Sequence, residues 1–249
     1  MNTNAEKTTL YIVSTPIGNL EDIGARAIET LKTAAAVACE DTRRTRKIFS
    51  RYQIPLPRVF FSYREHNEEP AGKRILQLLA AGRSVALCSD AGTPGISDPG
   101  YRIISSALNA GYRIDVIPGP SAVTSALLAS GLPTSTFTFK GFPPRKKGPL
   151  RKFLEMEKEA VHTLVFFESP HRTAAFIEAA AEVFGSRRAA VCIDLTKLYE
   201  EVHRGYLEEL GESLSGKKIK GEVTIVIAGS NPKFTRANEE NVGQPGMMK

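Results

Sequence analysis

Short apolar runs alternate with helical patterns through the first half of the chain. Between the runs, apolar residues recur at intervals of three and four, as on one face of a helix. The helices predicted from this spacing cover residues 25–32, 42–52, 70–81 and 99–110. The runs themselves are rich in β-branched residues and predict buried strands at 9–14, 35–39, 59–63, 84–89 and 113–117. This alternation predicts a parallel sheet covered by helices on both faces.

The second half of the chain has fewer helices between its strands. Helices are predicted at 121–130, 150–158 and 170–184, and strands at 136–142, 162–168, 189–195, 201–205 and 222–228. Several of these strands are joined by short turns, which predicts a mixed sheet. We therefore expect an α/β protein with an N-terminal domain over residues 1–118 and a C-terminal domain over 119–229. The polar segment 230–249 shows no apolar periodicity, and we expect it to be disordered.

The composition is that of an ordinary globular protein. Hydrophobic residues make up 42% and charged residues 24% of the chain, which excludes a disordered profile. No run approaches the roughly 20 apolar residues of a membrane span, and the first residues lack the basic-then-apolar layout of a secretory signal. We therefore expect a cytoplasmic chain. Cys39, Cys88 and Cys192 lie far apart in apolar runs without a CxxC motif, which predicts buried, reduced thiols and no metal site.

Positive charge gathers in three clusters. The formal net charge is +6, which alone is a weak indication of binding to a polyanion. Basic residues are concentrated at 43–51, 145–152 and 217–220. Each cluster is compatible either with a solvated face or with contacts to phosphates.

Two loops that follow predicted strands are candidates for ligand binding, because ligands of a parallel sheet bind beyond the carboxyl ends of its strands. The first, 15–22, contains no GxGxxG motif and on its own is compatible with a tight connection. The second, 89–100, contains three glycines and two prolines, which allow close approach to a ligand and stiffen the backbone. Within it, Asp98 followed by Pro99 predicts the start of a helix. We interpret 89–100 as a functional loop.

Eight segments, in this order, resemble the tetrapyrrole-methylase superfamily and, within it, the family of bacterial ribosomal RNA small subunit methyltransferases I. Together they span residues 15–227. Two of them, at 39–45 and 89–100, point to the ribosomal RNA branch and away from corrin, haem or diphthine methylases. The segments are TPIGNLEDI (15–23), CEDTRRT (39–45), EHNE (65–68), SDAGTPGISDPG (89–100), PGPSA (118–122), FFESPHR (166–172), LTKLYEE (195–201) and GEVTIVI (221–227).

The resemblance implies a two-domain fold that binds S-adenosylmethionine in a cleft between the domains, and a homodimer. It also implies methylation of the ribose 2′-oxygen of cytidine 1402 in the 16S RNA of the small ribosomal subunit. The residues of this chain at the family's cofactor-binding positions are Pro16, Ile17, Gly18, Asp90, Thr93, Ile96, Ser121, Ala122, Phe167, Leu195 and Thr224.

The implied reaction suggests roles for four further residues. A ribose hydroxyl is a poor nucleophile, so its methylation needs a general base or a cation that stabilises the forming alkoxide. Glu40 and Asp41 are candidate bases, and Lys197 and Arg43 are candidate electrostatic partners. Lys197 lies between apolar neighbours and is equally compatible with a surface lysine whose stem covers apolar area.

Two alternative functions stay open on the same fold. One is a methylase of a small tetrapyrrole-like substrate, which predicts a cleft lined by acids or histidine and needs no basic clusters. The other is a ribosome assembly factor that has lost catalysis. Under the ribosomal RNA hypothesis, the clusters at 43–51 and 145–152 would hold phosphates and contribute affinity without reading the sequence.

Overall fold

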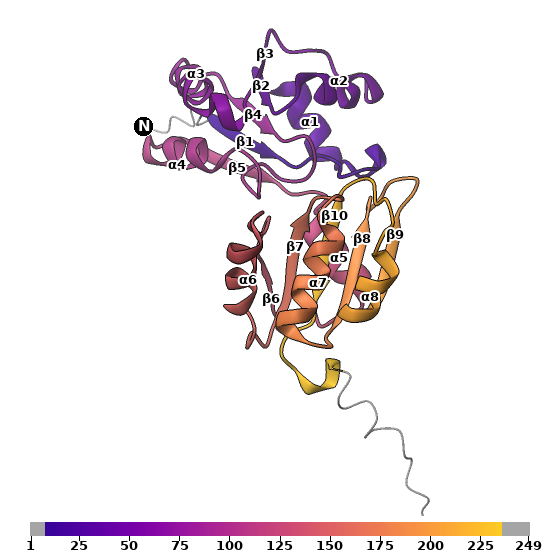
Figure 1. Cartoon of the computed structure of the whole chain (residues 1–249). Helices are drawn as coiled ribbons and strands as arrows, with labels where there is room; N and C mark the ends of the chain where they lie inside the picture. Colours follow the sequence, from indigo (N-terminus) through magenta and orange to yellow (C-terminus); the bar gives the residue numbers. More distant parts are fainter. Residues whose placement is uncertain (1–7, 236–249) are drawn as a thin grey trace, which may run out of the picture. The chain divides into compact units, whose positions relative to one another are not determined.

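The computed structural model describes residues 8–235, and the chain divides into two compact units, Met1–Ser121 and Ala122–Lys249. Each unit carries its own five-stranded sheet (Figure 1). An α/β chain with one parallel and one mixed sheet confirms the predicted fold class. The domain limits inferred from the sequence, 1–118 and 119–229, stay predictions.

The sheet of the first unit is parallel throughout, in the order β3-β2-β4-β1-β5. Because neighbouring strands run the same way, the loops after β1, β2, β3 and β4 all begin at one edge of this sheet. The strands are β1 Thr9–Val13, β2 Ala36–Cys39, β3 Val59–Ser62, β4 Val85–Cys88 and β5 Arg113–Ile117.

Helices cover both faces of this sheet, as the alternating pattern predicts. Side chains that alternate along each strand enter two separate cores. One core joins the sheet to α1 and α2, and includes Leu31 and Phe49; the other joins it to α3 and α4, and includes Ile75 and Ile103. The helices are α1 Ala25–Thr33, α2 Thr42–Arg51, α3 Glu68–Ala80 and α4 Tyr101–Asn109, with short 3-10 helices η1 Leu20–Asp22 and η2 Glu65–Asn67.

The second unit has a mixed sheet in the order β6-β7-β10-β8-β9, in which only β6 and β7 pair in parallel. Its largest core lies between the sheet and α6, α7 and α8, whereas α5 packs against β8 and β10. The strands are β6 Phe137–Phe139, β7 Thr163–Glu168, β8 Arg188–Ile193, β9 Glu201–Tyr206 and β10 Val223–Ile227. The helices are α5 Ala122–Ser130, α6 Lys147–Glu155, α7 Thr173–Phe184 and α8 Leu207–Leu214, followed by η3 Pro232–Phe234.

Three details differ from the sequence predictions. Helix α4 begins at Tyr101, with Gly100 rather than Asp98 at its N-cap, because the loop continues through a positive φ at Gly100. Helix α8 was not predicted, since it follows β9 without any turn signal. The predicted disordered segment 230–249 begins with η3 and a bridge from Thr235 to Arg187, and residues 236–249 lie outside the described part of the chain. The three cysteines are free and buried, as predicted.

The loop 89–100 is fastened to the end of β1. Thr15 and Gly92 exchange two backbone hydrogen bonds of 2.9 and 3.0 Å, and the hydroxyls of Ser14 and Thr93 lie 2.7 Å apart. The loop then folds back so tightly that a Cβ on Gly100 would lie 2.8 Å from the amide nitrogen of Gly95. Glycine at position 100 therefore meets a steric requirement of this fold-back.

Replacing Gly100 with alanine should destabilise the fold. Its φ of +151° and the close backbone of Gly95 both exclude a methyl group, and such strain costs about 2 kcal/mol. Gly148→Ala is the matched control, because a Cβ there meets nothing within 4 Å and alanine favours the helix. Urea unfolding of both variants checks the prediction, which is wrong if Gly100→Ala is as stable as the unsubstituted chain.

Candidate active site

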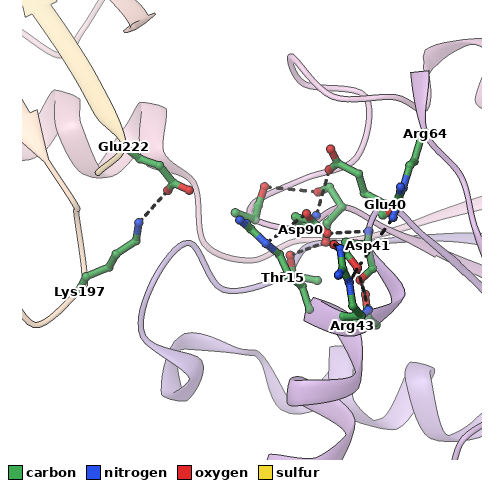
Figure 2. A network of polar contacts seen from close by, with 12 residues as sticks. Thr15, Glu40, Asp41, Arg43, Arg64, Asp90, Lys197 and Glu222 are labelled. Atoms are coloured by element: carbon green, nitrogen blue, oxygen red, sulfur yellow. Dashed lines mark hydrogen bonds and ion pairs between the residues drawn. The ribbon is translucent and has the colours of Figure 1, made fainter. Parts of the chain in front are cut away.

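Two acidic loops are tied together at the carboxyl edge of the parallel sheet. The Asp41 amide donates to the Asp90 carboxylate at 2.8 Å, and the Asp90 amide donates to the Glu40 carboxylate at 3.3 Å. These residues follow β2 and β4, which are neighbours in the sheet (Figure 2). The exchange fixes the position of Glu40 and Asp41 relative to the loop 89–100.

Asp41 is the N-cap of α2. Its carboxylate accepts a hydrogen bond from the Arg43 amide at 2.8 Å and pairs with the Arg43 guanidinium at 3.2 Å. The side-chain hydrogen bond from Arg43, followed by that from its amide, lowers the pKa of Asp41. A carboxylate held in this way is a weak base, so the structure favours a positioning role for Asp41. Arg43 itself is highly exposed, which suits contact with a polyanion.

Glu40 has the opposite character. Burial raises its pKa, and the nearby Asp90 charge adds to this effect, although the Asp90 amide and two arginines oppose it. The guanidinium of Arg64 donates to the Glu40 carbonyl at 2.7 Å and lies 3.9 Å from Asp41. Of the two candidate bases, Glu40 is therefore the one whose pKa is raised, so it binds a proton more tightly than Asp41 does.

Glu40 and Asp41 open onto a polar pocket of about 410 Å³ within the first unit. Such a volume suits a nucleoside-sized group. Six lining residues were not predicted as site residues, although the EHNE segment contains two of them and the loop 89–100 three more. The pocket is lined by Glu40, Asp41, Arg64, Glu65, His66, Asp90, Ser97, Asp98 and Pro99.

The predicted cofactor contacts of the first unit lie in the loops after β1, β4 and β5. Pro16 and Ile17 are buried, whereas Gly18 is exposed. Ile96 has 53% of its surface exposed and its amide donates to the Thr93 carbonyl, so the loop presents an apolar side chain to solvent. The Asp90 carboxylate is already engaged by the Asp41 amide and by Arg44 at 3.5 Å. Ser121, the remaining predicted contact of this unit, is half-buried at the unit's end.

The predicted contacts of the second unit gather around β7, β8 and β10. Phe167 and Thr224 lie directly opposite each other in the ladder between β7 and β10, and Leu195 follows β8. The Phe167 ring packs on Phe139 and Phe142, with ring centroids 4.7 and 5.6 Å apart. Ala122, the first residue of α5, is half-buried.

Lys197 belongs to a charged triplet in the second unit. Its ammonium lies 2.6 Å from the Asp194 carboxylate and 3.2 Å from that of Glu222 (Figure 2). Burial alone would lower the pKa of Lys197, but the hydrogen bond that its ammonium donates to Asp194 and the charge of Glu222 outweigh burial and raise that pKa. Lys197 therefore stays protonated and can act as a cation but not as a base.

No metal site is evident within residues 8–235, where no cluster of three or more His, Cys, Asp or Glu side chains has a suitable arrangement. Over the same residues, no helix is long and apolar enough to cross a bilayer.

Comparison with known proteins identifies the family. The profile of the tetrapyrrole (corrin/porphyrin) methylases matches residues 9–211. Ribosomal RNA small subunit methyltransferase I of Halalkalibacterium halodurans is 47% identical over 228 residues, which is 92% of this chain and 78% of that protein. The chain belongs to the ribosomal RNA small subunit methyltransferase I family. The protein of the same name from Thermotoga maritima is 43% identical over 88% of this chain and 98% of its own length.

Solved structures agree with this family's fold. Diphthine synthase superposes with a TM-score of 0.68 at 18% identity, over 89% of this chain and 90% of that one. Uroporphyrin-III-C-methyltransferase from Thermus thermophilus gives a TM-score of 0.61 at 22% identity, over 89% and 94%. At these identities the likeness shows the fold alone.

For this methyltransferase I family member, Glu40→Gln should raise stability at neutral pH. Because the folded-state pKa of Glu40 is raised, ionising it opposes folding, and this cost appears as pH rises above the unfolded value. Glutamine removes that cost, so its advantage should grow from pH 4 to pH 7 and vanish in acid. Melting temperatures measured across this range check the prediction.

Glu69→Gln is the control, because the pKa of Glu69 is shifted in the opposite direction to that of Glu40. Its partner Lys73 lowers the pKa of Glu69, so this substitution should give no gain at neutral pH. A Glu40→Gln melting temperature at or below that of the unsubstituted chain at pH 7 would show that burial of Glu40 is not costly.

Proposed function

We propose that the chain transfers a methyl group from S-adenosylmethionine to the ribose 2′-oxygen of a cytidine in small-subunit ribosomal RNA, at position 1402 of 16S RNA. The main support for ribosomal RNA as the substrate class is the identity of 47% to a ribosomal RNA methyltransferase over 92% of the chain. A carboxylate-lined pocket of nucleoside size beside the rigid loop 89–100 supports it, because carboxylates accept hydrogen bonds from ribose hydroxyls.

Each unit contains residues of the kinds that would contact an adenosyl sulfonium donor. Ile96 and Phe167 offer apolar surface, while the backbone of the loop 89–100 offers polar groups. The donor, when bound, supplies an electrophilic methyl group. The full set that we propose to contact it is Pro16, Ile17, Gly18, Asp90, Thr93, Ile96, Ser121, Ala122, Phe167, Leu195 and Thr224.

Glu40 is the proposed general base. It would accept the proton of the 2′-hydroxyl as the oxygen forms its bond to the methyl carbon and the carbon–sulfur bond breaks. A raised pKa brings the proton affinity of Glu40 closer to neutral pH, where a base is most effective. Lys197 is the proposed cation, because its triplet keeps it protonated, as the stabilisation of a developing negative charge requires. Asp41 and Arg43 then position the loop and the RNA.

Basic surfaces would hold the RNA backbone. Helix α2 presents Arg43, Arg44 and Arg51, each with more than half of its side chain exposed. The cluster at 145–152 covers the start of α6, where the lysines and arginines are also exposed. Contacts of this kind give affinity that falls steeply with salt. We also propose that the protein acts as a homodimer in the cytoplasm, which the resemblance to its family supports.

A small tetrapyrrole-like substrate is less well supported. The pocket contains several acids and His66, as that alternative predicts. However, the basic face of α2 has no role with such a substrate, and the 40–47% identical relatives carry the name of ribosomal RNA methyltransferases. A non-catalytic assembly factor would have no need of the glycine–proline loop at 89–100.

Small ribosomal subunits that lack the modification should accept one labelled methyl group from S-adenosylmethionine, mapped to the cytidine ribose. Glu40→Gln should lower kcat about 100-fold or more, because a general base contributes that much. Lys197→Ala should lower kcat about tenfold or more, since an electrostatic partner of the alkoxide is lost.

Asp41→Asn is the control for Glu40→Gln, since asparagine also caps a helix and should retain most of the turnover. Full turnover by Glu40→Gln or by Lys197→Ala, with normal affinity for S-adenosylmethionine, would remove that residue from the mechanism. Label appearing on porphyrinoids but not on subunits would replace the proposed substrate.

A further inference from the structure

The second unit contains a hollow of about 690 Å³ that no proposed role yet uses. The ends of β8 and β9 form one side of it, and the segment between α8 and β10 forms the other. Ile193, Leu214 and Ile219 supply apolar surface to the hollow. We call it the lysine hollow, because its rim carries Lys217, Lys218 and Lys220.

These three lysines are cations without neutralising partners. All three are exposed, and over residues 8–235 no carboxylate lies within ion-pair distance of their ammonium groups. By contrast, Arg43 and Arg44 on α2 each pair with an aspartate. Three unpaired ammonium groups within four positions repel one another, and a polyanion would relieve that repulsion.

The two carboxylates that line the lysine hollow have partners other than the rim lysines. Asp194 accepts from Lys197 and from the Glu222 amide. Glu201 lies 2.9 Å from the ring nitrogen of His203. Neither acid pairs with the rim lysines, and the three ammonium groups outnumber the two lining carboxylates, so the hollow attracts anions.

An aromatic ring stands at the same rim. Tyr199 has 78% of its surface exposed, and its ring contacts no other aromatic ring or cation among the residues that the structure describes. It lies in the turn between β8 and β9, next to Leu198, which is 87% exposed. An exposed ring beside unpaired cations is the combination that binds single-stranded nucleic acid, since a base stacks on the ring while lysines hold the phosphates.

The lysine hollow is also fastened to the turn that carries Lys197. The Asp194 amide donates to the Glu222 carbonyl at 2.9 Å, and the Glu222 amide donates to the Asp194 carboxylate at 3.1 Å. Gly221 has a φ of +91° and lies so close to the Asp194 carboxylate that a Cβ would overlap it. The Asp194 side of the hollow and the turn that carries Lys197 are thereby joined by hydrogen bonds.

We propose that the lysine hollow binds an unpaired nucleotide of the RNA substrate, with phosphates on Lys217, Lys218 and Lys220 and a base stacked on Tyr199. This inference rests on the proposed function, because it assigns a contact for the same RNA. The hollow would add affinity and hold a flanking nucleotide, without taking part in the chemical step.

The test compares a triple variant, K217A/K218A/K220A, with a charge-matched control, K32A/K73A/K158A, whose exposed lysines lie elsewhere. Binding of a fluorescein-labelled single-stranded RNA that contains the target cytidine is measured over a range of salt concentrations. The triple variant should bind at least about tenfold more weakly, and its slope of log Kd against log salt should fall by about 2, because each phosphate contact on a single strand contributes about 0.7. The control should lose much less affinity and keep a steeper slope.

Tyr199 gives a second, independent readout. Tyr199→Ala should weaken RNA binding about tenfold, whereas Tyr199→Phe should restore it, because stacking needs the ring and not the hydroxyl. In methyl transfer, both the triple variant and Tyr199→Ala should raise KM for the subunit and leave kcat and the affinity for S-adenosylmethionine unchanged.

Two outcomes separate this inference from the proposed function. If the triple variant binds RNA as the control does, the lysine hollow is not an RNA site, even where the unsubstituted chain methylates subunits. If the unsubstituted chain methylates nothing but the triple variant still loses RNA binding, the proposed function fails and the site stands.

Discussion

The first unit depends on a reciprocal exchange between two strand ends. Asp90 accepts from the Asp41 amide and Glu40 accepts from the Asp90 amide, so the loops after β2 and β4 hold each other in place. Burial raises the pKa of Glu40 and the nearby Asp90 charge adds to this effect, whereas the hydrogen bond from the Asp90 amide opposes it. Arg44 and Arg64 offset part of this repulsion. One set of hydrogen bonds thus fixes the two loops that line the pocket, while burial sets the direction of the Glu40 pKa shift.

The second unit uses a carboxylate in a similar way. Asp194 binds the Glu222 amide and the Lys197 ammonium, and it adopts a positive φ of 49° to do so. A non-glycine residue in this conformation is held there by its surroundings. In both units, an aspartate beside a candidate functional residue accepts a backbone hydrogen bond that fixes a turn. Asp90 does so beside Glu40, and Asp194 does so beside Lys197.

Much of this organisation could be predicted from the sequence. Alternating apolar runs predict both sheets, and the loop 89–100 stands out because three glycines and two prolines are more than a simple connection needs. The roles of Glu40 and Asp41 could not be separated, since adjacent acids look alike until one of them caps α2. Arg64 and His66 were missed as site residues because their loop reaches the pocket only through the strand order β3-β2-β4. Strand order is a long-range property that local pattern does not reveal.

The central claim is that this chain binds an adenosyl sulfonium donor through the loop 89–100 and its partners. Calorimetric titration of the purified full chain with S-adenosylmethionine tests it most directly. The account predicts saturable binding at one site per chain, with clear heat of binding below about 1 mM donor. No saturable binding over that range would contradict the account, whatever RNA the protein binds.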